Sequence, residues 1–278
     1  MSWLVGILVV VVVLGLLWLL SLRGRRGAGR IGELDGWLYA HRGYHRDPDA
    51  PENSAKAFSL AVEAGLGAEL DVHLLKDGGL AVLHDSSLKR MTGKKGRVED
   101  LCVSDLKKIR LGKSEETIPT LQEILAIFQG KTPLIIELKT VGGNAVPLCE
   151  TVMEALKEYD GLYCIESFDP KVVWWLRRHR PDIIRGQLST NFFKDPEKLS
   201  LPARFAATNL LANFLTRPDF VAYCHKYRHQ PSNRICRSLW KIKGASWTLR
   251  SPKALAEAQA EGLWPIFEGF DPATGKKL

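Results

Sequence analysis

The sequence predicts an α/β protein: a closed (β/α)8 barrel of the TIM type, preceded by one N-terminal transmembrane helix. Three observations support this prediction. An uncharged apolar run opens the chain, strand-like and helical segments alternate after residue 36, and the alternating part is about 240 residues long. Strands that alternate with helices form βαβ units and a parallel sheet. About eight strands in about 240 residues match the size of a closed barrel.

The predicted elements alternate along the whole barrel region. Strand-like apolar runs lie at residues 37–43, 68–75, 80–85, 133–139, 163–168, 183–189, 205–212, 244–249 and 264–270. Helical patterns lie at residues 55–65, 104–112, 120–128, 146–159, 170–179, 219–228 and 252–262. A doubly wound open sheet fits the same periodicity, but no Gly-x-Gly-x-x-Gly follows the first strand, which disfavours its dinucleotide-binding form. Residues 76–120 are long for one connection between strands, so we expect them to contain an inserted segment that lies beside the functional site.

Residues 3–22 form the first predicted element, a membrane anchor. They carry no charge, and a helix of this length covers the hydrocarbon layer of about 30 Å. Trp3 and Trp18 lie near its ends, where interfacial tryptophans are enriched. A cleaved signal peptide is the alternative, but no basic stretch precedes the segment and its apolar core is longer than that of a signal peptide.

The segment after the apolar run, residues 23–36, is rich in glycine and charge, and it predicts a basic linker to a barrel domain at residues 37–278. Four arginines follow the anchor: Arg23, Arg25, Arg26 and Arg30. Because no basic side chain precedes the anchor, the positive-inside rule predicts a single-pass cell-membrane protein with a cytoplasmic barrel. Five cysteines without a Cys-x-x-Cys pair agree with a reducing compartment.

The net charge of +8 does not indicate nucleic-acid binding, because Lys and Arg are interspersed with acids. With 45% hydrophobic and 25% charged residues, the composition is that of a folded protein. The positive excess suits anionic partners such as phosphate esters or acidic lipid head groups. No protein partner can be inferred from the composition.

Two acids on the predicted second strand indicate a metal site. Glu69 and Asp71 are two residues apart, so both side chains point to one face of the strand. Side by side they repel each other unless a cation lies between them, and oxygen ligands favour a hard divalent cation such as Mg2+ or Ca2+. Two surface acids are the alternative, which a barrel strand disfavours because it lies between the lumen and the helices.

A third acid, Glu137, follows a fully apolar stretch and shares one strand face with Lys139. The two could form a buried ion pair with each other; alternatively, Glu137 binds the metal and Lys139 binds a substrate anion. His41 and Arg42 end the first strand and His84 ends another, at the positions where barrel enzymes carry catalytic groups. One histidine alone would favour a structural role, but two of them with three acids favour an active site.

Six short motifs follow one another along the chain: His41-Arg42-Gly43, Pro51-Glu52-Asn53-Ser54, Glu69-Leu70-Asp71-Val72, Lys76-Asp77-Gly78, His84-Asp85 and Glu137-Leu138-Lys139. This order resembles that of the glycerophosphodiester phosphodiesterase family, which belongs to the phosphatidylinositol-phospholipase-C-like barrel phosphodiesterases and carries HRG, PENT, E-x-D-V, K-D-G, HD and E-x-K. The likeness covers residues 37 to 270. The ordered set is far more specific than any single motif.

Four positions depart from the family pattern. Ser54 replaces the usual Thr, Leu75 replaces a Thr before Lys-Asp-Gly, and Glu166 stands where Gln is common. The last strand reads IFEGFDP, residues 266–272, in place of a TD-x-P motif. The first two changes lie outside the chemistry, whereas the last bears on the final loop and the specificity that it confers.

The resemblance implies metal-dependent hydrolysis of glycerophosphodiesters to glycerol phosphate and an alcohol. A hydroxyl of the substrate's own glycerol would attack, giving a cyclic phosphate that water then opens. His41 would act as general base, His84 as general acid, and Arg42 would bind the nonbridging oxygens. Glu52 would bind the metal or support a ligand, and Asn53 could serve only as a helix cap.

Other conspicuous residues receive weaker assignments. Trp247 ends a predicted strand and is a candidate to stack against the substrate, although a core role fits it nearly as well. His73 shares the face of Glu69 and Asp71 but has no visible partner, so no role is assigned to it. Three histidines are expected at the surface: His179, His225 and His229. Trp174 and Trp175 are expected to pack in the core or to contact a partner.

Two rival functions remain open. A lysophospholipase D acting on membrane lysolipids is close to the first function, because the anchor would hold the site near lipids. A non-catalytic membrane protein that binds phosphoesters belongs to another class. The sequence disfavours this second rival, because a binding protein does not need two proton-transfer groups.

Overall fold

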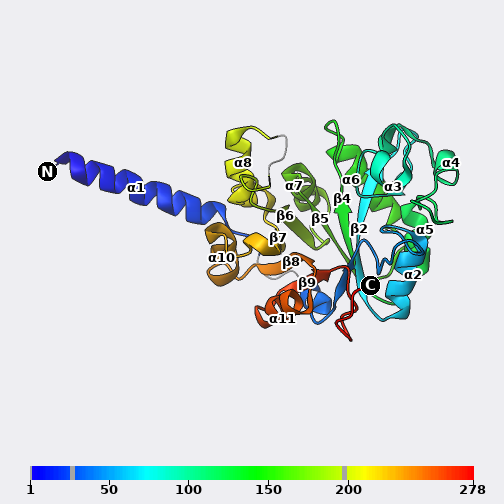
Figure 1. Cartoon of the computed structure of the whole chain (residues 1–278). Helices are drawn as coiled ribbons and strands as arrows, with labels where there is room; N and C mark the ends of the chain where they lie inside the picture. The colour runs from blue at the N-terminus through cyan, green and yellow to red at the C-terminus, as the bar shows by residue number, and fades with distance from the viewer. Residues whose placement is uncertain (1, 26–28, 196–198) are drawn as a thin grey trace.

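The computed structural model describes residues 2–25, 29–195 and 199–278. Its centre is a barrel of parallel strands surrounded by helices (Figure 1). The barrel strands are β1 (Tyr39–His41), β2 (Gly67–Leu74), β4 (Leu134–Leu138), β5 (Tyr163–Ser167), β6 (Arg185–Ser189), β7 (Phe220–Cys224), β8 (Lys243–Leu249) and β9 (Trp264–Phe267).

The sheet closes on itself through its first strand. Strand β1 pairs in parallel with β2 on one side and with β9 on the other. The remaining strands pair in parallel in chain order, so the barrel has no open edge. The predicted (β/α)8 barrel is therefore confirmed, and the open doubly wound sheet is excluded.

Helices cover the outside of the barrel, and capping side chains fix where several of them begin. They are α2 (Ala55–Glu63), α5 (Leu121–Phe128), α6 (Ala145–Ala155), α7 (Pro170–His179), α8 (Leu201–Thr208), α9 (Asn213–Thr216), α10 (Pro231–Ser238) and α11 (Pro252–Ala260). The backbone N–H of Ala57 donates to Ser54 Oγ at 3.1 Å, which starts α2. Thr120 and Glu123 form a capping box at the start of α5.

Strand β2 shows how the sheet separates apolar from polar side chains. Ala68, Leu70 and Val72 are buried in the cluster shared with the surrounding helices. Because side chains alternate along a strand, Glu69 and Asp71 project to the opposite side, into the barrel. The shared face that the sequence predicts for these two acids is therefore confirmed.

An apolar cluster closes the end of the barrel at which the strands begin. Tyr39, Ile135, Phe220 and Trp264 are buried together there. The hydroxyl of Tyr39 donates to the carbonyl oxygen of Leu34 at 2.8 Å, in the short 3-10 helix η1 (Ile31–Leu34) that precedes β1. The polar side chains therefore gather at the other end, where parallel barrels carry their active sites.

The connection between β2 and α5 contains a folded insertion, as predicted. It comprises β3 (Leu80–Val82), α3 (Lys89–Thr92), η2 (Val98–Asp100) and α4 (Val103–Leu106). Its apolar side chains form a small cluster of their own, including Leu83, Val98 and Ile118. Strand β3 pairs antiparallel with β2 outside the barrel, so the strand-like run at residues 80–85 is a strand of the insertion. The predicted helix at 104–112 is reduced to the one turn of α4.

Two neighbouring assignments in the C-terminal half were wrong. Residues 205–212, expected as a strand, form the second half of helix α8 and the turn after it. Ser200 caps this helix, and Pro202 lies in its first turn. Residues 219–228, expected as a helix, form strand β7 and a 3-10 turn, η3 (His225–Tyr227). Strand β7 is buried on both faces, so the alternation that would mark a strand is missing from its sequence.

Helix α1 (Ser2–Ser21) leaves the barrel as a long arm (Figure 1). Residues 3–21 have a mean hydropathy of 3.0, and none of this stretch is buried within the protein. The end of α1 is bound to the barrel: Trp240 Nε1 donates to the carbonyl oxygen of Leu19 at 2.9 Å, and Leu22 is fully buried. Arg25 forms an ion pair with Asp219. The linker prediction for residues 23–36 did not foresee these contacts.

Candidate active site

Three carboxylates form the centre of the polar end of the barrel. Glu69 and Asp71 extend from β2 and Glu137 from β4, and the strand register places Asp71 opposite Glu137. One oxygen of each carboxylate lies within 4.8 Å of the others, and all three side chains are buried. Three buried oxygen donors at this spacing fit a hard divalent cation. The structure therefore brings together the three acids that the sequence predicts as metal ligands.

Lys139, one residue beyond β4, supplies positive charge to this cluster. Its Nζ lies 2.9 Å from Asp71 Oδ1 and 2.8 Å from Glu137 Oε1. Burial alone would lower the pKa of Lys139, but Asp71 and Glu137 outweigh it and raise that pKa. Lys139 therefore remains a cation. It forms the ion pair with Glu137 that the sequence suggests, and its position at the site is also compatible with binding a substrate anion.

The protonation of the three acids is uneven. Burial, followed by repulsion from Asp71 and Glu137, holds the pKa of Glu69 well above its usual value. Burial raises the pKa of Glu137 to about 7, although Lys139 opposes this. For Asp71 the effect of burial is outweighed by Lys139, His84 and Arg42, which keep its pKa well below normal. Without a cation, the cluster relieves its repulsion by keeping protons, and a bound cation would displace them.

Arg42 is held against the acids by an unusual backbone conformation. Its φ of 56° is left-handed, and this turn directs its backbone N–H to Glu69 Oε2 at 3.0 Å. Its guanidinium donates to Glu52 at 2.9 Å and lies 3.5 Å from Asp71. Gly43 continues the turn with a φ of 82°, and a Cβ there would lie 3.0 Å from Ala57 on helix α2. The HRG triplet is thus a tight turn that presents the arginine to the site.

The PENS segment supports this turn. Asn53 Nδ2 donates to Asp71 Oδ2 at 2.8 Å, whereas Ser54 caps helix α2. The suggestion that Asn53 serves only as a helix cap was therefore wrong. Glu52 accepts hydrogen bonds from Arg42 and Arg90, so it lies in an ion-pair network beside the group of three acids.

His41 is held by a residue that the sequence reasoning missed. His41 Nδ1 forms a hydrogen bond with the carboxylate of Glu268, which directly follows β9, and its Nε2 lies 3.8 Å from Glu69 Oε2. Burial lowers the pKa of His41, and Glu268 partly offsets this effect. Despite burial, the hydrogen bond with His41 lowers the pKa of Glu268 to about 2. Glu268 lies in the IFEGFDP segment, the main departure from the family pattern.

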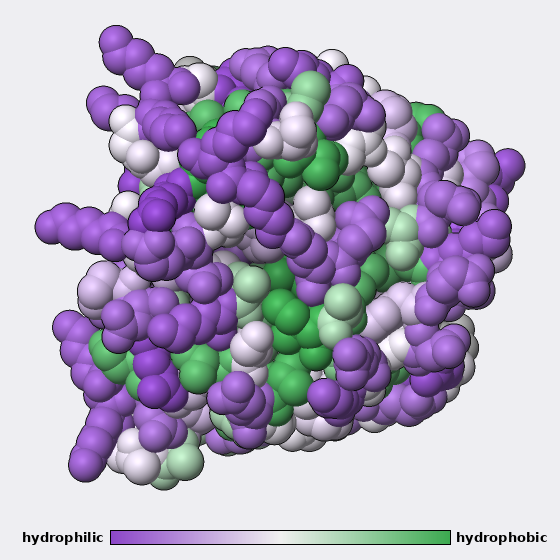
Figure 2. Space-filling view, turned by 90° about the vertical axis from the view of Figure 1, so that its right-hand side faces the viewer, coloured by the Kyte–Doolittle hydropathy of each residue, from purple (hydrophilic) through white to green (hydrophobic). Residues whose placement is uncertain are grey.

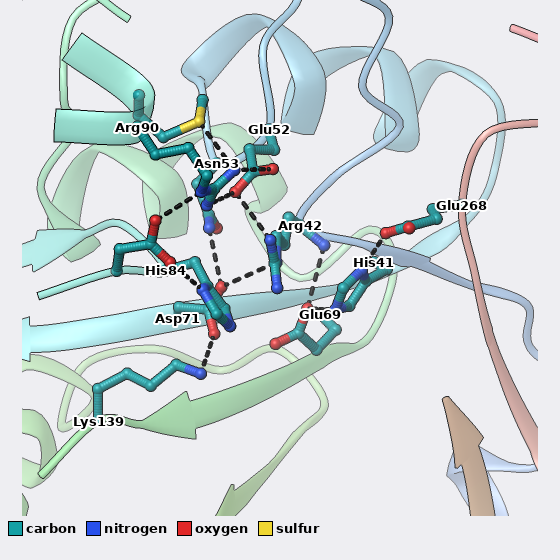
Figure 3. Close-up of polar contacts among 12 residues, drawn as sticks. His41, Arg42, Glu52, Asn53, Glu69, Asp71, His84, Arg90, Lys139 and Glu268 are labelled. Carbon is teal, nitrogen blue, oxygen red and sulfur yellow. Dashed lines mark hydrogen bonds and ion pairs between the residues drawn. The ribbon is translucent and has the colours of Figure 1, made fainter. Parts of the chain in front are cut away.

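His84 belongs to the insertion and has its own carboxylate. Its Nδ1 lies 2.6 Å from Asp85 Oδ1, and Arg90 binds the other oxygen of Asp85 at 2.5 Å. Burial and then Lys139 lower the pKa of His84 to about 4. Figure 3 shows the guanidinium of Arg42 between the imidazoles of His84 and His41. Both histidines keep Nε2 free of the carboxylate that orients them.

His73 has the partners that the sequence did not reveal. Its Nδ1 lies 2.9 Å from Glu99 Oε1, and its Nε2 lies 3.2 Å from the carbonyl oxygen of His84. Glu99 also accepts a hydrogen bond from Ser86. These contacts join β2 to the insertion directly beneath His84, so His73 and Glu99 fix the position of that histidine.

Glu166, one of the expected departures from the family pattern, is buried on β5 opposite Glu137. Burial and then Glu137 hold the pKa of Glu166 well above its usual value. A protonated Glu has nearly the shape of Gln and, like Gln, is neutral. This departure from the family pattern therefore leaves the local charge unchanged.

Trp247 lies in a small aromatic group near the ends of the strands. Its ring meets Phe168 edge to face, with centroids 5.6 Å apart, and Phe168 also meets Phe192 in the same way. The indole is half-buried, and in the described part of the chain no acceptor bonds its buried Nε1. It is therefore neither a pure core residue nor a free surface one.

The remaining predictions about histidine and tryptophan have mixed outcomes. His179 and His229 are exposed, as expected. His225 is half-buried and its Nδ1 lies 2.9 Å from Ser246 Oγ, so its placement at the surface was wrong. Trp175 is buried, which fits the expected core packing, and Trp174 is exposed, which fits the alternative of a partner contact.

Comparisons with known proteins identify the family of this chain. A model of the glycerophosphoryl diester phosphodiesterase family matches residues 41–264. A glycerophosphodiester phosphodiesterase of Caldanaerobacter subterraneus is 39% identical over 200 residues, which cover 68% of this chain and 81% of the relative. One of Bacillus altitudinis is 40% identical over 201 residues, with the same shares.

Solved structures show the same fold. A phosphodiesterase of Oleispira antarctica, in complex with the product sn-glycerol-3-phosphate, matches with a TM-score of 0.69 and 23% identity. The match covers 85% of this chain and 94% of that one. With the family model spanning most of the barrel, the chain belongs to the glycerophosphoryl diester phosphodiesterase family.

Proposed function

We propose that this chain hydrolyses glycerophosphodiesters to glycerol phosphate and an alcohol, with Mg2+ or Ca2+ bound by Glu69, Asp71 and Glu137. One observation carries the proposal. Two histidines, each oriented by a carboxylate at Nδ1, flank a cluster of three buried acids and two cations. This arrangement can cancel the charge of a phosphodiester and move a proton on each side of it.

Each residue has a defined task in this proposal. Arg42 and Lys139 bind the nonbridging oxygens of the phosphate, and the cation, when bound, neutralises further negative charge. Glu268 keeps the proton of His41 on Nδ1, so Nε2 can accept a proton from the attacking hydroxyl. Asp85 orients His84 in the same way, and His84 protonates the leaving alkoxide. The charge of the bound phosphate raises the pKa of both histidines, which suits His84 as an acid.

Turnover of glycerophosphocholine tests this function. The purified protein should release choline and glycerol phosphate, lose activity in EDTA, and regain it with Mg2+ or Ca2+. Full activity in thoroughly chelated protein would contradict the metal assignment. No turnover with any divalent cation would favour the non-catalytic binding protein instead.

A second candidate, lysophospholipase D activity, is favoured by the aromatic group near the site. Phe168 is partly exposed at the edge of Trp247, and such an apolar rim can hold an acyl chain or a glycerol backbone. Rates on lysophosphatidylcholine and on glycerophosphocholine should be compared in the same preparation. A Trp247→Ala variant that loses only the lysolipid rate would support the second candidate.

We also propose that α1 is retained as a membrane anchor with the barrel on the cytoplasmic side. The length and apolar composition of α1 support the anchor, and the arginines that follow it support the orientation. Protease added outside spheroplasts should leave the barrel intact. Digestion there would reverse the orientation, and a mature protein that begins after residue 22 would identify a cleaved signal peptide.

A further inference from the structure

Helix α1 joins the barrel within one continuous stretch of the chain, residues 199–256. Helix α1 contacts α9, Leu19 accepts a hydrogen bond from Trp240, and Leu22 lies in a cluster with Ile242. In Figure 1, α8 and α10 lie on either side of the point at which α1 meets the barrel. These helices surround the base of the arm.

The positive charge of the protein is concentrated in this same stretch. Residues 199–256 contain ten Lys and Arg residues but a single acid, Asp219, which gives a net charge of +9. Because the whole chain carries +8, the other 220 residues have a net charge of −1. The one acid is buried and paired with Arg25. Acids outside the stretch pair with four of its basic residues, Arg228, Arg237, Lys243 and Arg250. This asymmetry favours an anionic partner on one side of the barrel.

Large apolar side chains are exposed on the helices beside the arm. Leu201 and Phe205, one turn apart on α8, are 68% and 54% exposed. Phe214 and Leu215 on α9, the helix that contacts α1, are each 49% exposed. Exposed apolar side chains of this size next to one another indicate an interaction surface rather than ordinary solvent contact.

A basic cleft lies on the α10 side of the arm. It has a volume of about 720 Å³, and its lining includes Arg234, Arg237 and Lys241. Arg237 is paired with Glu261, whereas Arg234 and Lys241 have no carboxylate partner in the described part of the chain. Lys241 directly follows Trp240, whose indole donates to Leu19 near the end of α1. Such a cleft suits a phosphate-bearing head group.

The opposite face of the molecule differs from this side. Figure 2 views the protein from the side away from α1, where hydrophilic residues cover most of the surface and smaller apolar areas show between them. The apolar side chains of α8 and α9 therefore do not continue a general feature of the surface. They belong to the side from which the arm leaves.

We propose that the side formed by α8, α9 and α10 docks on the surface of an anionic phospholipid bilayer, the same bilayer that α1 spans. Leu201, Phe205, Phe214 and Leu215 enter the interfacial region, and Arg234 and Lys241 bind lipid phosphates. The proposal goes beyond the hydrolytic activity and rests only on the retained anchor. Apolar side chains together with basic ones are the combination that holds interfacial helices on anionic membranes, and the arm keeps this side at the membrane.

The test uses the full chain in lipid nanodiscs with an environment-sensitive fluorophore on one cysteine. Cys102 and Cys224 are replaced by Ser, since the other three cysteines are buried. The label is placed by Phe205→Cys or Leu215→Cys. The matched control is Ala126→Cys, an exposed position on α5, which lies far from α1 in Figure 1. Lipids with a nitroxide near the head group serve as quencher, with and without phosphatidylglycerol.

Labels at 205 and 215 should shift their emission to the blue and be quenched by the nitroxide lipid, more strongly with phosphatidylglycerol. The label at 126 should show neither effect. Reversing charge with Arg234→Glu and Lys241→Glu should remove the dependence on phosphatidylglycerol, whereas Lys131→Glu with Lys157→Glu should not. Quenching at 205 and 215 no stronger than at 126 would overturn the proposal.

Two further outcomes also decide the matter. A blue shift that depends on protein concentration and occurs without lipid quenching would assign the surface to a second protein molecule and overturn docking on lipid. A chain that fails to enter the nanodiscs would overturn the anchor and the docking together. Glycerophosphocholine turnover is measured in the same samples, so that quenching without turnover leaves docking standing while the proposed function fails.

Discussion

The candidate active site has two halves that differ in how they are built. One half extends from the barrel strands and contains Glu69, Asp71 and Glu137, whose positions follow from the parallel register of β2 and β4. The other half belongs to the insertion and contains His84 and Asp85. The Asp71 side chain is 1% exposed, whereas that of His84 is 32% exposed. The barrel strands thus hold the buried carboxylates, whereas the insertion holds a more exposed histidine and its carboxylate.

The largest expected effect is on metal affinity, which a change in the strand half should lower and a change in the insertion should not. Asp71→Asn removes the carboxylate that Lys139, Arg42 and Asn53 hold, and it should lower the metal affinity about 10-fold or more and turnover by about 100-fold or more. Asp85→Asn in the insertion should leave the metal affinity unchanged. Calorimetric titration with Mg2+ or Ca2+ measures both. Equal metal affinity in the Asp71→Asn protein and the unmodified protein would contradict the metal role of the strand half.

The two histidines should differ in their response to the leaving group. His41→Ala and His84→Ala should each lower turnover of a natural diester by about 100-fold or more. On a nitrophenyl diester the leaving group needs no proton, so His84→Ala should recover most of its rate while His41→Ala stays impaired. Recovery of His41→Ala instead would exchange the two roles. Unchanged turnover of the natural diester in both variants would remove histidine acid-base catalysis altogether.

Glu268 and Asp85 should affect the pH dependence of turnover differently, because each binds a different histidine. Removing either carboxylate should cost about 10-fold to 100-fold in kcat. Glu268 favours the protonated form of His41, so Glu268→Gln lowers the pKa of His41 and should move the acidic limb of the pH-rate profile to lower pH. Asp85→Asn should leave that limb in place. Glu268→Asp, which keeps the charge, should retain most of the profile; an acidic limb that does not move in Glu268→Gln would show that Glu268 does not act through His41.

The smallest expected effect is a link between metal and pH in the strand half. Glu137 has a pKa of about 7 in the folded chain, raised from 4.5 mainly by burial. Without a cation, its contribution to stability is present at low pH and is lost as the pH rises from 4.5 to about 7. A cation must displace that proton, so Mg2+ should raise Tm more at about pH 8 than at about pH 6. Glu137→Gln should make the Mg2+-induced rise in Tm equal at the two pH values. A rise that is already equal at both pH values in the unmodified protein would contradict the prediction.

The parts of the site that lie along one strand could be predicted from the sequence. Alternation on β2 placed Glu69 and Asp71 on one face, and the same rule paired Glu137 with Lys139. Contacts between distant segments could not be predicted in this way. His41 and Glu268 are 227 residues apart in the chain, and only closure of the barrel brings β1 beside β9.

The errors in the fold have local causes. The apolar residues of α8 follow a serine cap and a proline, a start signal that the strand assignment of 205–212 ignored. Strand β7 is buried on both sides, so its sequence lacks the alternation of a half-exposed strand. The role of His73 was missed because its partner, Glu99, lies in the insertion, whose path cannot be read from periodicity.

The insertion has a hydrophobic cluster separate from that of the barrel. A unit with its own small core opens by its own equilibrium, at a lower free energy than global unfolding. We therefore expect the insertion, which carries His84, to unfold before the barrel. Heat should abolish turnover at a lower temperature than it abolishes the near-ultraviolet circular dichroism of Trp264 and its neighbours, and cooling from between these temperatures should restore activity without refolding of the barrel.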